Sequence, residues 1–319
     1  MGKYLYDKDL SVVVPVFNEE GNLPELYCRL TAVLSALTEK YEIIFVNDGS
    51  SDGSLRLIED FAAADSRVYY IALSRNFGHQ VAVSAGLDYV RGRATVIMDA
   101  DLQDPPELIP ELYGKHTEGY QVVYVRRRKR EGESAFKKIS AKLFYRLMRR
   151  VARIDMPMDT GDFRLVDHHI VSCLRRMPEQ SKFLRGQIAW MGYRQTGIEL
   201  DRPERKHGRS GYSVSKMFAL AFDGITGFSN KPLEWVSRMG LIVFLIALAV
   251  IIYSLIRHYI YHQTVEGWTS IIASSMFIGG IQLLSVGVIG SYIARINKNT
   301  DNRPLYLIAD SNIETDSEE

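Results

Sequence analysis

Residues 10–20 read LSVVVPVFNEE, a β-branched apolar run that ends in polar side chains. The same pattern recurs in IIFVNDGSSDG at 43–53, YIALSRNFGH at 70–79 and TVIMDADLQD at 95–104. Near-continuous apolar runs of this length are typical of strands buried on both faces of a parallel sheet. Helical periodicity fills the intervals between them. The sequence therefore predicts an α/β fold with a doubly wound, mostly parallel sheet.

Five strands and four helices are predicted over the first 125 residues. The strands are Leu10–Phe17, Tyr41–Asn47, Val68–Leu73, Ala94–Met98 and Gln121–Val125. The helices are Leu23–Leu37, Ser54–Ala64, Gln80–Val90 and Pro106–Thr117. A single polar strand end is more often a turn or a helix cap than a site. Four such ends at the carboxyl edge of one parallel sheet favour a ligand site there.

The sharpest chemical signal at this edge is the acidic pair Asp99-Ala100-Asp101. Two carboxylates at i and i+2 beyond a strand suit a hard divalent cation that also contacts a diphosphate. No G-x-G-x-x-G follows the first strand and no G-x-x-x-x-G-K-[ST] occurs. The dinucleotide-binding and P-loop interpretations therefore lose their main support.

The overall composition hides an uneven distribution of charge. The chain has 319 residues, 46% of them apolar, and a formal net charge of +1. This composition excludes collagen-like, disordered and disulfide-stapled chains. The net charge is −9 over residues 1–120, +13 over 121–238 and −3 over 239–319. An acidic block before a basic one favours a metal site beside a surface for an anion or an anionic membrane.

Two uncharged stretches, Met239–Ile256 and Gly267–Ala294, are long enough to cross a bilayer. A pair of buried core helices is the competing interpretation. Basic residues flank the outer ends of both stretches, so the positive-inside rule places both chain ends in the cytoplasm. We expect a multi-pass protein of the cytoplasmic (inner) membrane, with its sheet domain on the cytoplasmic side.

Two amphipathic segments, Phe136–Ile154 and Val214–Phe228, precede these stretches. The first surrounds an apolar stripe with Lys and Arg, a pattern typical of helices that lie on an anionic membrane surface. Docking onto the core of the sheet domain is an alternative. A DNA-binding helix is disfavoured by the two predicted spans, so nucleic acid is not an expected partner.

Between these segments, Arg202–Tyr212 combines basic side chains with glycine and hydroxyl groups, the ingredients of a phosphate cradle. A solvated basic loop is the alternative interpretation. The position of the loop between two membrane-directed helices favours a lipid phosphate headgroup. The predicted acceptor-phosphate ligands are Arg202, Arg205, Arg209 and Ser210.

The segments VPVFNEEGN, VNDGSSDGS, LSRNFGHQ and MDADLQDPPE resemble glycosyltransferases of family two, which have the GT-A fold. TGDFRLVD, FLRGQIAWMGYRQ and AFDGITGFS resemble the polyprenyl-phosphate glycosyltransferases within that family, close to its bactoprenol glucosyltransferase and dolichol-phosphate mannosyltransferase groups. The resemblance runs from about Leu10 to Ala294. It implies an inverting transfer of a sugar from a nucleotide-sugar donor to a polyprenyl phosphate.

The resemblance also implies roles for residues on the donor side. Asp48 would accept a hydrogen bond from the base, and Asp99 and Asp101 would bind Mg2+ or Mn2+. The turn Arg126–Glu131 matches a mobile loop that closes over the diphosphate. The remaining expected donor-site residues are Pro15, Asn18, Glu20, Gln103, Arg126 and Arg130. His79 is given equal weight as a site residue and as a solvated loop residue.

On the acceptor side, Asp162 matches the aspartate of the family, and Asp159 is the weaker candidate because registers differ between subgroups. With Asp101, these are the expected catalytic residues. A phosphate monoester is already largely dianionic at neutral pH, so a general base is less necessary than for a hydroxyl acceptor. Asp162 is therefore open to two roles, as a base or as a group that positions the acceptor or the metal.

Four regions follow from these patterns: a catalytic core at 1–135, an acceptor-side region at 136–232, two membrane helices at 233–296 and a cytoplasmic tail at 297–319. The preferred reaction is glucose transfer from UDP-glucose to undecaprenyl phosphate. One alternative is the same reaction with GDP-mannose or an aminoarabinose donor. The others are a processive polysaccharide synthase and a binding or lipid-translocating protein with a degenerate transferase domain. Small residues at Gly280, Gly287 and Ser291 predict a homo-oligomer, and the tail could add a strand to a neighbour.

Overall fold

The computed structural model describes residues 6–127, 160–200, 231–259, 267–301 and 303–313. These residues fall into two compact units. The sheet unit contains the described residues up to Leu200 and those from Arg303 onward. The helical unit contains α9 (Lys231–Tyr259) and α10 (Trp268–Thr300).

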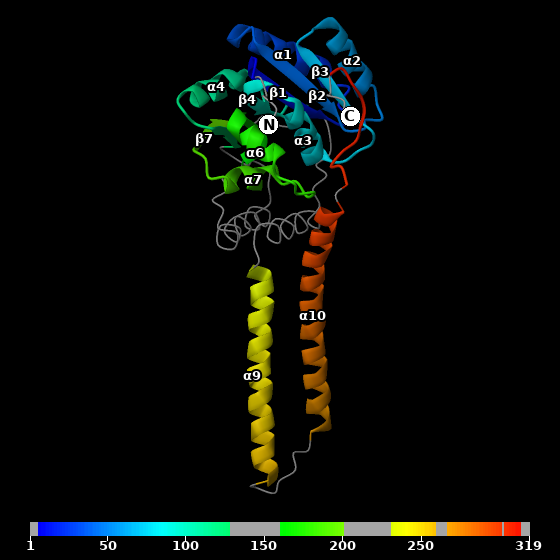
Figure 1. Cartoon of the computed structure of the whole chain (residues 1–319), viewed down its shortest axis with the longest axis vertical. Helices are drawn as coiled ribbons and strands as arrows, with labels where there is room; N and C mark the ends of the chain where they lie inside the picture. The colour runs from blue at the N-terminus through cyan, green and yellow to red at the C-terminus, as the bar shows by residue number, and fades with distance from the viewer. Residues whose placement is uncertain (1–5, 128–159, 201–230, 260–266, 302, 314–319) are drawn as a thin grey trace. The chain divides into compact units, whose positions relative to one another are not determined.

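Within the described residues, eight strands form one sheet in the order β7-β5-β6-β4-β1-β2-β3-β8. Figure 1 labels β1 to β4 and β7 of this sheet. The pairs β1–β2, β1–β4, β2–β3 and β5–β7 are parallel, whereas β6 runs antiparallel to β4 and β5, and β8 runs antiparallel to β3. The mostly parallel α/β sheet is thereby confirmed. The strands are β1 (Lys8–Val16), β2 (Tyr41–Asn47), β3 (Val68–Leu73), β4 (Gly92–Ile97), β5 (Val122–Arg127), β6 (Thr160–Asp167), β7 (Gln195–Leu200) and β8 (Ile308–Ser311).

Helices cover both faces of this sheet because successive strand side chains point to opposite faces. Val12 and Val14 pack with α1 (Leu23–Leu37), α2 (Ser54–Ala64) and α4 (Ile109–Thr117). Val13, on the opposite face, packs with α3 (His79–Tyr89), α6 (His168–Arg175) and α7 (Leu184–Trp190). A short 3-10 turn, η1 (Pro106–Leu108), leads into α4. The three-layer arrangement leaves the ends of the strands as the accessible edges.

The predicted elements of the first 125 residues lie close to the observed ones. The bounds of α1 and α2 match the predicted helices, and β1 begins two residues before the predicted strand. The elements β6, α6, α7 and β7 were not predicted as such. The tail prediction needs a correction, because β8 pairs with β3 of its own chain rather than with a neighbour. β8 occupies the side of β3 whose hydrogen-bonding groups no other described strand pairs.

The helical unit contains two long apolar helices of 29 and 33 residues. Their windows Leu233–Val250 and Phe277–Thr300 are long and apolar enough to cross a membrane by length and composition. Large apolar side chains such as Leu241 and Leu283 are exposed in the isolated chain, at 59% and 75%. The predicted amphipathic segments at 136–154 and 214–228 lie outside the described residues.

Candidate active site

The loops after β1 and β2 are joined by hydrogen bonds at the carboxyl edge of the sheet. Asn18 lies in the left-handed region at φ 56°, and its side-chain oxygen accepts a hydrogen bond of 2.8 Å from the backbone amide of Ser51. The Glu20 carboxylate accepts one of 2.9 Å from the amide of Gly53. Both predicted donor-site residues therefore have a structural role, because they fix the two loops against each other.

Asp48 is buried, at 2% exposure, and organises the loop after β3. Its carboxylate accepts hydrogen bonds from the backbone amides of Phe77 (2.7 Å) and Gly78 (3.0 Å). Burial raises the pKa of Asp48, and the two amides oppose that rise without cancelling it. Gly78 has φ 101°, a conformation that favours glycine, so the turn that presents these amides depends on this residue type.

A small pocket opens beside Asp48 between the ends of β1, β2 and β3. Its lining combines apolar side chains with an amide, a carboxylate and an imidazole, a mixture suited to a planar base with polar edges. Of the predicted nucleotide-binding residues it includes Pro15 and Asp48, and not Asn18 or Glu20. The lining residues are Pro15, Val16, Phe17, Asp48, Asn76, Gly78, His79 and Ala82.

The acidic pair follows β4 directly, at the same edge of the sheet. Asp101 accepts a 3.1 Å hydrogen bond from the backbone amide of Gln103, and Leu102 between them has φ 57°. The left-handed conformation of Leu102 and this hydrogen bond together define the backbone turn that follows the acidic pair. Two carboxylates at one strand end are the donor set that Mg2+ and Mn2+ prefer. The chemistry of Asp99 and Asp101 therefore fits the predicted divalent cation.

Asp162 joins the same edge from the start of β6, which runs antiparallel to β4. Its carboxylate is only 14% exposed and forms a two-point ion pair with Arg185 of α7, with Nε–Oδ1 at 2.7 Å and Nη2–Oδ2 at 2.8 Å. Arg185 also donates to the carbonyl of Thr160 at 3.0 Å. The imidazole Nε2 of His79 lies 3.3 Å from Asp162 Oδ2 and 3.6 Å from Asp99 Oδ1.

This arrangement sets the charge states of Asp162 and His79. Burial alone would raise the pKa of Asp162, but the Arg185 guanidinium and His79 outweigh it and hold that pKa well below its usual range. Burial likewise disfavours a charged His79, yet Asp162 and Asp99 raise the pKa of the imidazole above 6.5. A carboxylate so well paired is a weak proton acceptor. Asp162 is better suited to orient charge than to act as a general base.

The sequence motifs predicted some of these positions and left others out. Arg126 is exposed at the end of β5 and pairs in register with Thr160, which places it at the edge that carries Asp162. Arg185 had no predicted role, although the motif FLRGQIAWMGYRQ contains it. Its charge in a short helix near an acidic edge was the available signal. The predicted residues Arg130, Asp159, Arg202, Arg205, Arg209 and Ser210 lie outside the described residues.

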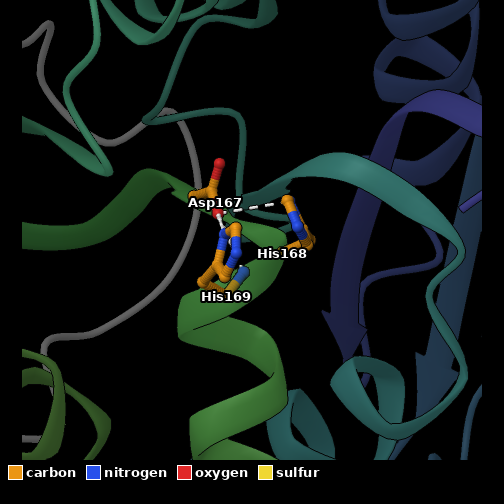
Figure 2. A group of neighbouring side chains, drawn as sticks. All are labelled: Asp167, His168 and His169. Carbon is orange, nitrogen blue, oxygen red and sulfur yellow. Dashed lines mark hydrogen bonds and ion pairs between the residues drawn. The ribbon is translucent and has the colours of Figure 1, made fainter. Parts of the chain in front are cut away.

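A second group of possible metal ligands lies at the opposite ends of the strands, where β4 begins and β6 ends. Asp167, at the end of β6, lies beside His168 and His169, and their ligand atoms are within 4.8 Å of one another (Figure 2). Asp167 Oδ1 accepts the backbone amide hydrogen of His169 at 2.8 Å and so caps α6. The register of Asp167 with Ala94, at the start of β4, separates this group from the pair that follows the end of β4.

A mostly parallel α/β sheet, with an acidic pair and a small pocket at the carboxyl ends of its strands, is the arrangement of transferases of the GT-A type. Residues 11–175, from β1 to the end of α6, match the family model described as Glycosyl transferase family 2. The chain belongs to that family and is a glycosyltransferase.

Curated relatives resemble nearly the whole chain. An uncharacterized glycosyltransferase of Bacillus subtilis, YkcC, is 46% identical over 305 residues, which cover 94% of this chain and 93% of the relative. The bactoprenol glucosyl transferase of Shigella phage SfII is 36% identical over 302 residues, covering 95% and 98%. A solved structure of glucosyl-3-phosphoglycerate synthase from Mycobacterium tuberculosis, with Mn2+, UDP and phosphoglyceric acid, is 16% identical with a TM-score of 0.49 and covers 70% of this chain and 78% of that one.

Proposed function

We propose that this protein transfers one glucose from UDP-glucose to undecaprenyl phosphate, with inversion at the anomeric carbon. The observation that carries the proposal is the likeness to bactoprenol glucosyl transferase, which extends over 95% of this chain and 98% of the phage protein. Such coverage includes both the acidic edge and the two apolar helices. A lipid phosphate acceptor makes use of both parts, because its phosphate must reach the site while its chain stays in a bilayer.

The donor would bind across the pocket and the acidic edge. Asp48 lines the pocket and would accept a hydrogen bond from the base, and Phe17, at 48% exposure, offers an aromatic ring there. Asp99 and Asp101 would hold Mg2+ or Mn2+, which supplies charge neutralisation for the departing diphosphate. Arg126 lies at the strand end where it could contact the same diphosphate.

On the acceptor side, Asp162 keeps its charge and is held in place by Arg185 at two points. An acceptor phosphate is largely dianionic at neutral pH and attacks without losing a proton. We therefore assign Asp162 a positioning role, in which it orients the site through His79 and Arg185. The basic residues Arg202, Arg205 and Arg209, with Ser210, remain the predicted phosphate ligands. Asp159 and Arg130 likewise stay predictions.

We further propose that α9 and α10 cross the cytoplasmic membrane with both chain ends inside. Their apolar windows support this, as does the name of the bactoprenol relatives, since bactoprenol is a membrane lipid. Retention in the membrane after carbonate washing tests whether the helices are integrated. Selective labelling of Gly267→Cys by an external impermeant maleimide tests whether the connection between them lies outside. Cross-linking in mild detergent tests the predicted homo-oligomer.

The reaction is tested with the purified full chain in detergent, undecaprenyl phosphate and radiolabelled UDP-glucose. We expect a lipid product that carries a single hexose and forms only with added divalent cation. Asp101→Asn should abolish it, whereas Asp60→Asn, an exposed residue on α2, should not. GDP-mannose and aminoarabinose donors in the same assay test the alternative sugars. A polymeric product would support the synthase alternative, and the absence of any lipid product with every donor would refute the proposal.

A further inference from the structure

The chain returns to the sheet unit immediately after α10. Residues Arg303–Ile313, which we name the C-terminal strap, include β8 and lie against β3 and α3. β8 pairs antiparallel with β3, with Ile71 opposite Ser311 and Leu73 opposite Ile308. The strap is therefore part of the catalytic fold, although its sequence lies beyond both apolar helices.

Side chains as well as backbone hold the strap in place. The Tyr306 hydroxyl donates to the carboxylate of Asp88 on α3 at 2.8 Å, and the Tyr306 ring packs against the core. The Tyr70 hydroxyl of β3 donates to Asp310 at 2.8 Å, and the Tyr70 backbone amide donates to the side chain of Asn312 at 2.7 Å. These contacts fix the strap along its length rather than at one point.

The attachment points belong to the two elements that precede and follow the pocket loop in the chain. The backbone amide of Ser74, directly after β3, donates to the carbonyl of Leu307 at 2.9 Å. Asp88 belongs to α3, the helix that begins at His79. The loop between these two elements supplies Asn76 and Gly78 to the pocket. The strap therefore forms hydrogen bonds with both β3 and α3, the two elements that the pocket loop connects.

The connection between α10 and the strap is very short. Only Asp301 and Asn302 separate Thr300, the last residue of α10, from Arg303, whose carbonyl accepts a 2.8 Å hydrogen bond from Gln180. A connection of this length extends over no more than about 11 Å. The covalent connection thus limits the separation between Thr300 and Arg303, the first residue of the strap.

We propose that the C-terminal strap is a positioning element that sets the reach between the second apolar helix and the donor pocket, so that a membrane-held phosphate meets the anomeric carbon. This inference rests on the lipid acceptor proposed above. Holding two reactants at a fixed separation raises their effective concentration and limits unproductive orientations. A loosened connection should lower transfer to a membrane lipid and leave the donor site itself intact.

The test inserts a Gly-Ser linker of about twelve residues between Asn302 and Arg303, which adds roughly 20 Å of flexible reach. The control variant carries the same linker after Ile313, the last residue of the strap. Both full chains are reconstituted in liposomes with undecaprenyl phosphate. Three quantities are measured: UDP-glucose affinity, transfer to the liposomal lipid, and transfer to a short, water-soluble prenyl phosphate.

We expect the internal linker to lower liposomal transfer at least about tenfold while donor affinity and soluble-acceptor transfer stay within about twofold of the wild type. The control linker should change none of the three. Equal liposomal transfer by both variants would overturn the proposal, and so would an equal loss with both acceptors. A wild-type chain that transfers to neither acceptor would instead count against the proposed function.

A second pair of variants guards against a misfolded insertion. Tyr306→Phe removes the bond to Asp88 and should lower liposomal transfer more than soluble-acceptor transfer. Tyr113→Phe, on the opposite face of the sheet, is the matched control and should leave the ratio of the two rates unchanged. A Tyr306→Phe ratio identical to that of the control would contradict the positioning role.

Discussion

Replacing Arg185 with glutamine removes the cation that faces Asp162 at two points while leaving a side chain of similar length. Asp162 then stays in a site where its carboxylate is only 14% exposed, without the bonds of 2.7 and 2.8 Å that compensate its burial. The expected result is a loss of stability because a mostly buried carboxylate keeps His79 nearby but loses its two-point cationic partner.

The size of the loss follows from the exposure of the pair. Removing one partner of a fully buried ion pair costs about 3–5 kcal/mol. The Arg185 side chain keeps 30% of its exposure, so solvent screens part of the interaction. We therefore expect Arg185→Gln to lower the free energy of unfolding by roughly 2–3 kcal/mol. Asp162→Asn combined with Arg185→Gln should recover at least about 1 kcal/mol, because the stranded charge is gone.

The assay is urea unfolding of the full chain in detergent, followed by fluorescence. The chain has three tryptophans, so Trp235→Phe and Trp268→Phe leave Trp190, on α7 with Arg185, as the reporter. The free energy of unfolding in water is compared among the four chains of the double-mutant cycle, provided that the dependence of this free energy on urea concentration has the same slope in all four. Additive losses in the double variant would refute the reasoning, since they would mean that Asp162 and Arg185 do not interact.

Three further predictions concern the same edge of the sheet. Arg185→Gln removes the largest influence that lowers the pKa of Asp162, so the acid limb of the pH–transfer profile should move to higher pH. In the wild type the stabilisation from the depressed pKa is present above about 3.8 and is lost as pH falls through the lower pKa of the folded state, which unfolding midpoints against pH would show. Gly49→Ala, at φ 68° with a Cβ 2.6 Å from the Arg75 backbone, should cost more than about 1 kcal/mol in urea unfolding, and a cost near zero would contradict this close approach. Asp48→Asn turns one acceptor into a donor facing a loop amide and should weaken UDP binding about tenfold by calorimetry, whereas unchanged affinity would remove Asp48 from the donor site.

The strands and helices before Arg127 were predictable because their signals are local. Continuous apolar runs identified β1 and β2, and a helical stripe of leucines identified α1. β6 was not predicted as a strand, because its place depends on antiparallel pairing with β4, some seventy residues earlier in the chain. β8, with the sequence IADS, carries little strand propensity of its own and is defined by the open edge of β3.

The candidate site shows the same division. Asp48, Asp99 and Asp101 follow predicted strands, so the rule for parallel sheets already places them at one edge. The bidentate pair of Asp162 with Arg185 joins β6 to α7, and no spacing in the sequence specifies that contact. His79 was given equal weight as a solvated loop residue, and the structure places it between two carboxylates.

The position of β8 in the chain also has a consequence for biosynthesis. The ribosome produces α9 and α10 before it produces the strand that completes the sheet. Until that strand has been made, the hydrogen-bonding groups of β3 that later face β8 have no strand partner, and an open edge of this kind is a place for misassociation. The sheet unit can reach its final form only after the residues that follow α10 have been made, and a chain terminated before Arg303 would expose an unpaired edge of β3.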